Sequence, residues 1–160
     1  MDTGWLAAVE RSALSAAIRD SLWLYPAVET VHLLGLATLV GCAAAFDLRL
    51  LGVSRRLPAR ATARHLLRCA RGGFALAAVS GILLFVSDPV TIAANPAFRW
   101  KLGFIAVAGL NALRFHIGPF RTAETWDQNL PAPLSARVAA AVSLTVWAAA
   151  VTAGRLIAYV

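Results

Sequence analysis

Charged residues are scarce in this chain of 160 residues. Only 14% are Asp, Glu, Lys or Arg, whereas 59% are hydrophobic. A soluble domain carries about a quarter charged residues, because its surface must be hydrated. The shortage therefore excludes a soluble single domain and favours an integral membrane protein. The length predicts a single transmembrane domain over residues 1–160.

Acidic residues are scarcer than basic ones, and the formal net charge is +7. Such an excess can indicate a nucleic-acid partner. Here, however, seven of the fifteen basic residues lie between Arg49 and Arg71, in a segment that joins two apolar runs. Positive clusters beside membrane spans are the usual topogenic signal and also attract anionic lipid headgroups. The predicted partner is the lipid bilayer, with no nucleic acid.

Cysteine is nearly absent, with only Cys42 and Cys69. Both lie near span ends that flank the basic segment, which predicts free thiols on the reducing side of the membrane. The chain contains no CxxC or CxxCH motif, so c-type haem attachment is excluded. It also has no nucleophile–base motif, phosphate-binding loop or zinc-ligand spacing. The sequence thus assigns no enzymatic activity.

The chain contains long apolar runs. Four stand out, and each is long enough to cross a bilayer as a helix: 22–46, 66–87, 102–118 and 134–158. None alternates with a period of two, as barrel strands do. We therefore predict an all-α fold, an integral membrane four-helix bundle. Residues 2–20 mix charged and small apolar residues and predict a short N-terminal helix in the membrane interface.

The distribution of basic residues predicts the orientation. Ten of the fifteen lie on the first and third connections or their flanks. The opposite side holds the remaining five: Arg11, Arg19, Arg99, Lys101 and Arg155. Because the more basic side faces the cytoplasm, the loop 49–71 is predicted to be cytoplasmic. In a bacterial cell the chain would lie in the inner membrane, with both termini periplasmic.

The first apolar run contains Glu29 and His32, three positions apart and hence on one helix face. Ionisable groups at membrane depth are costly and by default mark a functional site. Three roles stay open for His32. A neutral imidazole can bind a haem iron or a soft metal such as copper. With Glu29 it can relay protons, and it can also simply hydrogen-bond a neighbouring helix.

His116, in the third run, is the second candidate ligand for haem or metal. Gly109 and Ala112 share its helix face and leave room beside the imidazole. Asn111 points about 140° away and is predicted to hydrogen-bond another helix. At 1.5 Å per residue, His116 lies about 9 Å deeper than His32, which disfavours one iron shared by both. His116 with His65, or His32 with another partner, therefore remain alternatives.

The outer ends of the runs carry a second set of charges. Lys101 opens the third run and Arg155 lies near the end of the fourth. Either could pair with Glu29 and lower the cost of its burial. Either could also bind haem propionates or an anionic substrate. On the inner side, Asp47 is predicted to pair with Arg49 or Arg114 as a structural anchor.

Two sequence strings carry a family resemblance. Residues 29–35 (ETVHLLG) and 46–52 (FDLRLLG) resemble the first span of a group of small four-span bacterial inner-membrane proteins of unknown function. Further matches are Asn95, Phe98 and Lys101, Asn111 with 115–116, and the segment 154–159. More remotely, the layout is similar to CopD-like copper-resistance membrane proteins and to haem-binding membrane protoporphyrinogen oxidases. In the latter group a first-span His and a later Lys and His recur, and His32, Lys101 and His116 match them in order.

Together these residues predict a b-type haem-binding membrane protein in electron transfer or membrane redox chemistry. Its predicted partners are a redox partner or a membrane complex. Association of the chain as a homo-oligomer is left open. The candidate cofactor-binding residues are His32, His116, Lys101, Arg155, Glu29 and Asn111, with His32 and His116 as metal ligands. The alternatives are a metal-ion or proton-linked transport or sensing protein without haem, and a structural subunit of a membrane complex.

Overall fold

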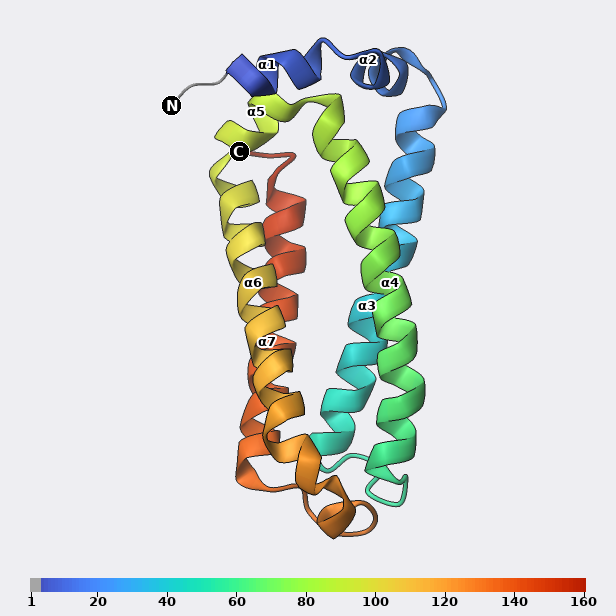
Figure 1. Ribbon diagram of the computed structural model, residues 1–160, viewed down its shortest axis with the longest axis vertical. Coiled ribbons are helices and arrows are strands. Elements are labelled where there is room, and N and C mark those ends of the chain that lie inside the picture. Colours follow the sequence, from blue (N-terminus) through green and yellow to red (C-terminus); the bar gives the residue numbers. More distant parts are fainter. Residues whose placement is uncertain (1–3) are drawn as a thin grey trace.

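The computed structural model describes residues 4–160 and consists of helices, with no strand among these residues. Four long helices run side by side in alternating directions (Figure 1): α3 Leu24–Leu51, α4 Ala59–Ser87, α6 Pro96–Ile117 and α7 Leu134–Leu156. The all-α prediction is confirmed. Three of these helices are long and apolar enough to span a membrane by themselves. The fourth, α6, meets that criterion together with the 3-10 helix η1, Pro119–Trp126, which bends from it by 52°.

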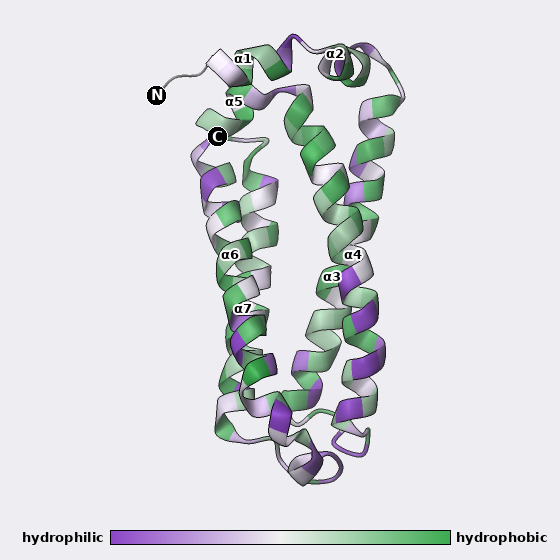
Figure 2. Cartoon of the chain, in the orientation of Figure 1, coloured by the Kyte–Doolittle hydropathy of each residue, from purple (hydrophilic) through white to green (hydrophobic). Residues whose placement is uncertain are grey.

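Apolar side chains cover much of the outer surface of these helices, as Figure 2 shows. Leu33 and Leu34 on α3 and Leu110 on α6 are more than half exposed. In water such a surface would be unstable, whereas hydrocarbon accepts it. The chain is therefore a multi-pass membrane protein whose helices contact lipid.

Each long helix except α7 extends beyond the apolar run that predicted it. The second begins at Ala59 rather than 66, and the third at Pro96 rather than 102. Hydropathy detects only the apolar part of a helix, whereas its ends are set by capping. Pro96 occupies the first turn of α6, where its missing N–H is not needed. Gly52 ends α3 with a φ of +112°, a conformation that glycine adopts without strain.

The N-terminal segment forms two short helices, α1 Gly4–Glu10 and α2 Ala13–Asp20, where a single one was predicted. The break comes at Ser12, whose side chain caps α2 by accepting a hydrogen bond from the Ser15 N–H. Both helices lie across one end of the bundle, beside α5 Pro89–Ala94 and the C-terminus (Figure 1). We call this the terminal end. The Ser15 hydroxyl donates to the Ser87 carbonyl and ties α2 to the end of α4.

The opposite end, formed by residues 52–58 and by η1, is called the basic end. Arg49 is only 2% exposed there. Its guanidinium donates to the carbonyls of Leu57, at 2.6 Å, and Asp127, at 2.8 Å. The predicted pairing of Arg49 with Asp47 is therefore wrong, because Arg49 binds loop carbonyls. A buried apolar cluster closes this end: Phe46, Leu50, Ala59, Ala63, Phe115, Ala123, Trp126, Ala132, Ala136 and Ala140.

The four long helices form an open arc in the order α4, α3, α7, α6. At the α3–α4 contact, a Cβ on Gly35 would lie 2.7 Å from the Ala77 nitrogen, and one on Gly73 would lie 2.6 Å from the Leu39 nitrogen. Only glycine allows backbones to approach so closely. By contrast, within residues 4–160 no Cα atom of α4 comes within 8 Å of one in α6. The arc is thus tightly packed between α3 and α4 and open between α4 and α6.

Candidate functional site

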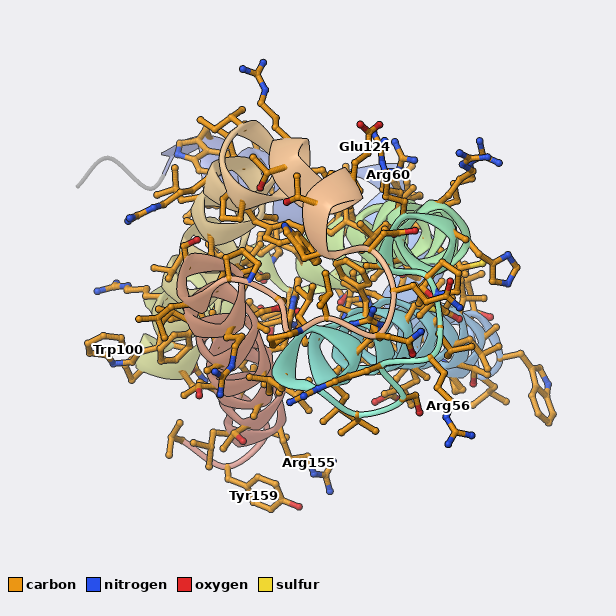
Figure 3. The ribbon with its side chains drawn as sticks, turned by 90° about the horizontal axis from the view of Figure 1, so that it is seen from below. Arg56, Arg60, Trp100, Glu124, Arg155 and Tyr159 are labelled. Carbon is orange, nitrogen blue, oxygen red and sulfur yellow. The ribbon has the colours of Figure 1, made fainter. Side chains whose placement is uncertain are left out.

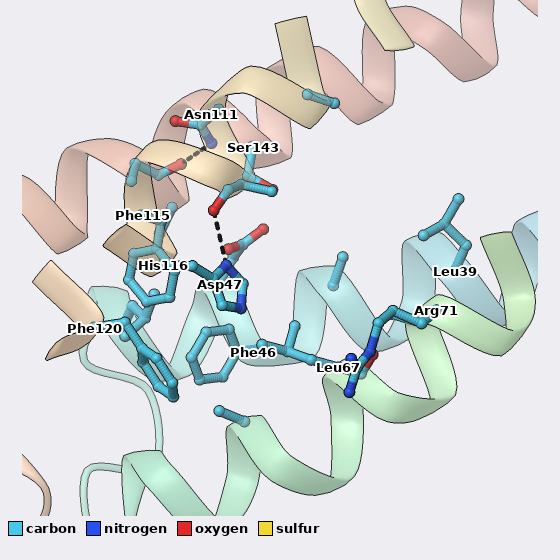
Figure 4. Close-up of a pocket in the computed structure, with 18 of the residues that line it drawn as sticks. Leu39, Phe46, Asp47, Leu67, Arg71, Asn111, Phe115, His116, Phe120 and Ser143 are labelled. Carbon is cyan, nitrogen blue, oxygen red and sulfur yellow. Dashed lines mark hydrogen bonds between the residues drawn. The ribbon is translucent and has the colours of Figure 1, made fainter. Parts of the chain in front are cut away.

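A cavity of about 790 Å³ lies inside the arc, in the half nearest the basic end (Figure 4). We call it the lateral cavity. Its walls come from α3, α4, α6 and α7, with Phe120 of η1 at one end. Its volume falls within the usual range for small-molecule and cofactor sites, roughly 300–1,000 Å³. Aromatic and apolar side chains make up most of the wall, and a few polar groups interrupt it.

Small residues on α6 create part of this space. Gly109 and Ala112 both line the cavity and are both exposed. A Cβ placed on Gly109 would meet no atom within 4 Å. The prediction that these two residues leave room beside His116 is confirmed. A Cβ at position 109 would therefore meet no clash, and because Gly109 lines the cavity we expect a larger side chain there to project into it.

An arginine stripe lines the wall that α4 contributes: Arg60, Arg64, Arg68 and Arg71. Their spacing of four, four and three residues places them on one helix face. Figure 2 shows the corresponding hydrophilic patches along the basic half of α4. In the sequence these residues indicated the membrane topology and an attraction to anionic lipid headgroups. Their helical spacing was the available signal that they share a face, although it does not say which helix or space that face meets.

Asp47 lies on the α3 wall of the cavity and is only 6% exposed. Ser143 of α7 lies close to its carboxyl group, yet the Oδ2 atom has no hydrogen-bond partner in residues 4–160. The predicted ion pair with Arg49 or Arg114 does not form. A buried carboxylate oxygen without a partner is costly, because nothing replaces the water it has lost. The Asp47 carboxyl is therefore available to a ligand that donates a hydrogen bond.

His116 lies on the α6 wall of the cavity, and its ring orientation is well defined. Its Nδ1 atom is 2.8 Å from the Ala112 carbonyl, and its ring packs against those of Phe115 and Phe120, each at a centroid distance of 5.5 Å. A carbonyl oxygen only accepts hydrogen bonds, so Nδ1 donates to it, and a neutral imidazole in this tautomer has its lone pair on Nε2. Metal-ligating histidines are commonly held in this way by a backbone carbonyl.

His32 lies elsewhere, in the contact between α3 and α4. Its Nδ1 atom is 2.8 Å from the Ala77 carbonyl and 3.1 Å from the Ser80 hydroxyl. A Cβ on Gly81 would lie 3.0 Å from its Cε1 atom, so the ring packs against that glycine. His32 does not line the lateral cavity. Of its three predicted roles, the hydrogen bond to a neighbouring helix is confirmed, and His32 and His116 belong to different parts of the bundle.

The predicted outer charges do not converge on one site. Within residues 4–160 the salt bridges are Arg19–Asp20 and Arg60–Glu124, so the expected pairing of Glu29 with Lys101 or Arg155 is wrong. Glu29 is exposed.

The two outer cations, Lys101 and Arg155, contact different residues. The Lys101 side chain lies against Gly154 of α7. Arg155 donates to the Tyr159 hydroxyl at 2.8 Å, and both side chains point away from the bundle (Figure 3).

Two further polar residues have clear positions. Asn111 donates through Nδ2 to the Ala139 carbonyl of α7 at 2.9 Å, so the predicted interhelical hydrogen bond is confirmed. Asn111 also lines the lateral cavity. His65 is exposed and lies outside that cavity, so it does not join His116. In residues 4–160, no three His, Cys, Asp or Glu side chains are grouped to hold a metal ion.

No protein-family model, curated protein or solved structure matches the chain. The resemblances noted in the sequence therefore remain predictions. Any proposal on function depends on the geometry of the lateral cavity.

Proposed function

We propose that the protein is a b-type haem-binding membrane protein in electron transfer or membrane redox chemistry. The haem would occupy the lateral cavity, and the Nε2 atom of His116 would hold its iron. One observation carries the proposal: an imidazole with a defined tautomer stands in the wall of a largely apolar cavity of about 790 Å³ that also carries arginines. A redox partner, a membrane complex or a second copy of the chain would exchange electrons with it.

The residues of the cavity fit such a group. A haem is held by a side-chain ligand to its iron, such as a histidine nitrogen, by apolar walls around its ring and by cations near its two propionates. The Nε2 atom of His116 supplies the first and the rings of Phe46 and Phe115 contribute to the second. Arg64 and Arg68 of the arginine stripe supply the third. The bound haem would contribute a one-electron redox centre, while the chain holds the iron, keeps water out and neutralises the carboxylates.

The proposed setting is a bacterial inner membrane, with the basic end in the cytoplasm and both termini outside. The support is the excess of arginine at the basic end, which favours retention on the cytoplasmic side. In this orientation the lateral cavity lies in the cytoplasmic half of the bilayer.

A visible spectrum tests the haem proposal. The protein is expressed with ample haem, purified in mild detergent and examined by reduced-minus-oxidised spectroscopy. We expect Soret and α bands that His116→Ala abolishes, whereas His65→Ala, at an exposed position outside the cavity, retains them. A wild-type protein without these bands would refute the proposal. Bands that survive His116→Ala but vanish in His32→Ala would assign the iron-holding residue to the α3–α4 contact.

Copper binding, or metal-ion or proton transport centred on Glu29 and His32, has less support from the geometry. The Nδ1 atom of His32 is engaged by Ala77 and Ser80, and Glu29 is exposed. His32 and His116 do not line one site. Metal analysis of the same purified sample would detect a copper ion in place of haem.

A further inference from the structure

We propose that the lateral cavity takes its ligand sideways from the lipid bilayer, and that this ligand is an amphiphile with an anionic head. The inference goes beyond the haem proposal, because it concerns a second kind of occupant, a membrane amphiphile that would use the same cavity when haem is not bound and that does not require iron. It depends on the opening between α4 and α6, on the arginine stripe and on Asp47.

The opening lies between two contacts that join α4 to the other side of the arc. Near the terminal end, the Phe85 ring of α4 stacks on that of Phe98 in α6, with a centroid distance of 5.4 Å. At the basic end, Arg60 pairs with Glu124 of η1, and Figure 3 shows the two side chains pointing toward each other. Between these contacts the backbones of α4 and α6 stay apart. The cavity residues in this stretch include exposed ones on both helices.

This opening faces lipid rather than water. Phe74 on α4 is 48% exposed, and Leu110 and Leu113 on α6 are 67% and 58% exposed. Exposed apolar side chains on the two helices that flank an opening indicate hydrocarbon outside it. The basic end is closed by the buried cluster around Phe46 and Trp126. A ligand that enters between α4 and α6 therefore comes from the membrane.

The charges lining the cavity select the head group. Arg64 and Arg68 form no hydrogen bond or ion pair with residues 4–160, so their guanidinium groups are available. Guanidinium binds phosphate and carboxylate through paired, charge-assisted hydrogen bonds. Arg71 lies twelve positions into α4, about 18 Å from its start, so the stripe extends toward the membrane interior. An anionic head could thus be bound along the wall while its apolar part stays in hydrocarbon.

Asp47 adds a second requirement on another wall. Its buried Oδ2 atom lacks a partner although arginines line the same cavity, so the two kinds of charge do not neutralise each other. A ligand whose head carries both an anion and a hydroxyl group satisfies both walls. The anion binds the arginines and the hydroxyl donates to Asp47. Phosphatidylglycerol has this chemistry and serves as the probe.

Native mass spectrometry of the purified protein tests the inference. The protein is mixed with equal amounts of phosphatidylglycerol and phosphatidylcholine that carry the same acyl chains. We expect the bound fraction to favour phosphatidylglycerol by about tenfold, the factor expected for charge-assisted hydrogen bonds. Equal binding of the two lipids would overturn the proposal. So would loss of phosphatidylglycerol on addition of inorganic phosphate, because the ligand would then be a free anion.

Two pairs of variants locate the binding. Gly109→Phe should fill the cavity and remove the bound lipid, whereas Gly103→Phe should not, because Gly103 also meets no atom within 4 Å but lies outside the cavity. Arg64→Gln with Arg68→Gln should remove the preference for phosphatidylglycerol. Arg55→Gln with Arg56→Gln, in the exposed loop, should retain it. Equal effects within either pair would refute a cavity site and indicate binding to the general basic surface.

The Asp47 component has its own readout. Phosphatidic acid shares the phosphate but lacks the head-group hydroxyls. Asp47→Leu should reduce the preference for phosphatidylglycerol over phosphatidic acid and leave the preference over phosphatidylcholine in place. An unchanged ratio would refute the role of Asp47. Circular dichroism checks that each variant is folded, and the haem spectrum is recorded separately, so that a failure of the haem proposal is distinguishable from a failure of this one.

Discussion

The helix α4 has two faces, and they meet their neighbours in opposite ways. Toward α3 it presents small residues at spacings of three and four, all buried: Ala70, Gly73, Ala77 and Ser80. Toward α6 it presents the arginine stripe and lines an open cavity. Both faces belong to one continuous helix. A membrane helix can therefore provide a tight packing surface on one side and a ligand-binding wall on the other.

Two glycines, Gly73 and Gly109, show the same contrast between tight packing and open space. Gly73 has backbone atoms within 3 Å of where its Cβ would be, whereas Gly109 has no atom within 4 Å. Both lie in membrane helices, and both look alike in the sequence. The difference comes from the partner: Gly73 faces the backbone around Leu39 and Gly35, while Gly109 faces the lateral cavity. Small residues thus permit either close contact or empty space, depending on the opposite wall.

The largest expected effect on stability is at the tight contact between α3 and α4. Gly73→Ala places a Cβ 2.6 Å from the Leu39 nitrogen and 2.8 Å from the Gly35 oxygen, and neither backbone atom can move freely. We expect the free energy of unfolding to fall by about 3 kcal/mol, the upper part of the usual range for overpacking. Thermal unfolding in detergent, followed by circular dichroism, measures this. Gly72→Ala is the control, because Gly72 meets no atom within 4 Å; similar losses for both would contradict the contrast.

A smaller effect on stability is expected at Phe85, at the edge of the opening between α4 and α6. Phe85→Leu removes the stack on Phe98 and should lower the free energy of unfolding by about 1 kcal/mol. It should also widen the distribution of α4–α6 distances, because this stack is a contact between the two helices. Spin labels on their lipid-facing surfaces report those distances. Phe74→Leu, on the cavity wall, provides the comparison; a distribution that widens only for Phe74→Leu would place the contact elsewhere.

The smallest effect on stability is expected at Gly109. Gly109→Leu projects into the lateral cavity without a clash, so the free energy of unfolding should stay within about 0.5 kcal/mol of wild type. The same thermal unfolding measurement applies. A loss as large as that for Gly73→Ala would mean that α4 and α6 close on each other in the membrane, and the distinction between the two sides would not hold.

The sequence predicted much of what depends on local pattern. The apolar runs located the long helices, and the helical spacing of Gly109, Ala112 and His116 predicted the room beside that imidazole. The hydrogen-bonding role of Asn111 followed from its depth in a span. Such features need only the period of a helix and the polarity of the membrane.

The wrong predictions concern which charged side chains meet one another. Glu29 was paired with Lys101 or Arg155, and Asp47 with Arg49 or Arg114, because opposite charges at similar depth were assumed to meet. In the bundle Arg49 binds loop carbonyls and Arg155 binds Tyr159, so neither is available. Depth along a helix is a local property, whereas the facing partner depends on rotation and on the order of the helices.

By itself the sequence determined that this is an all-helical membrane protein, because a chain so poor in charge and so rich in long apolar runs satisfies its backbone groups in lipid only as helices. Only the tertiary structure decided that α4 packs on α3 and stands apart from α6. That arrangement separates His32 from His116 and brings the arginine stripe, Asp47 and His116 to one cavity. The physical reason is that close packing depends on two matching surfaces, and a sequence read along one helix contains only one of them.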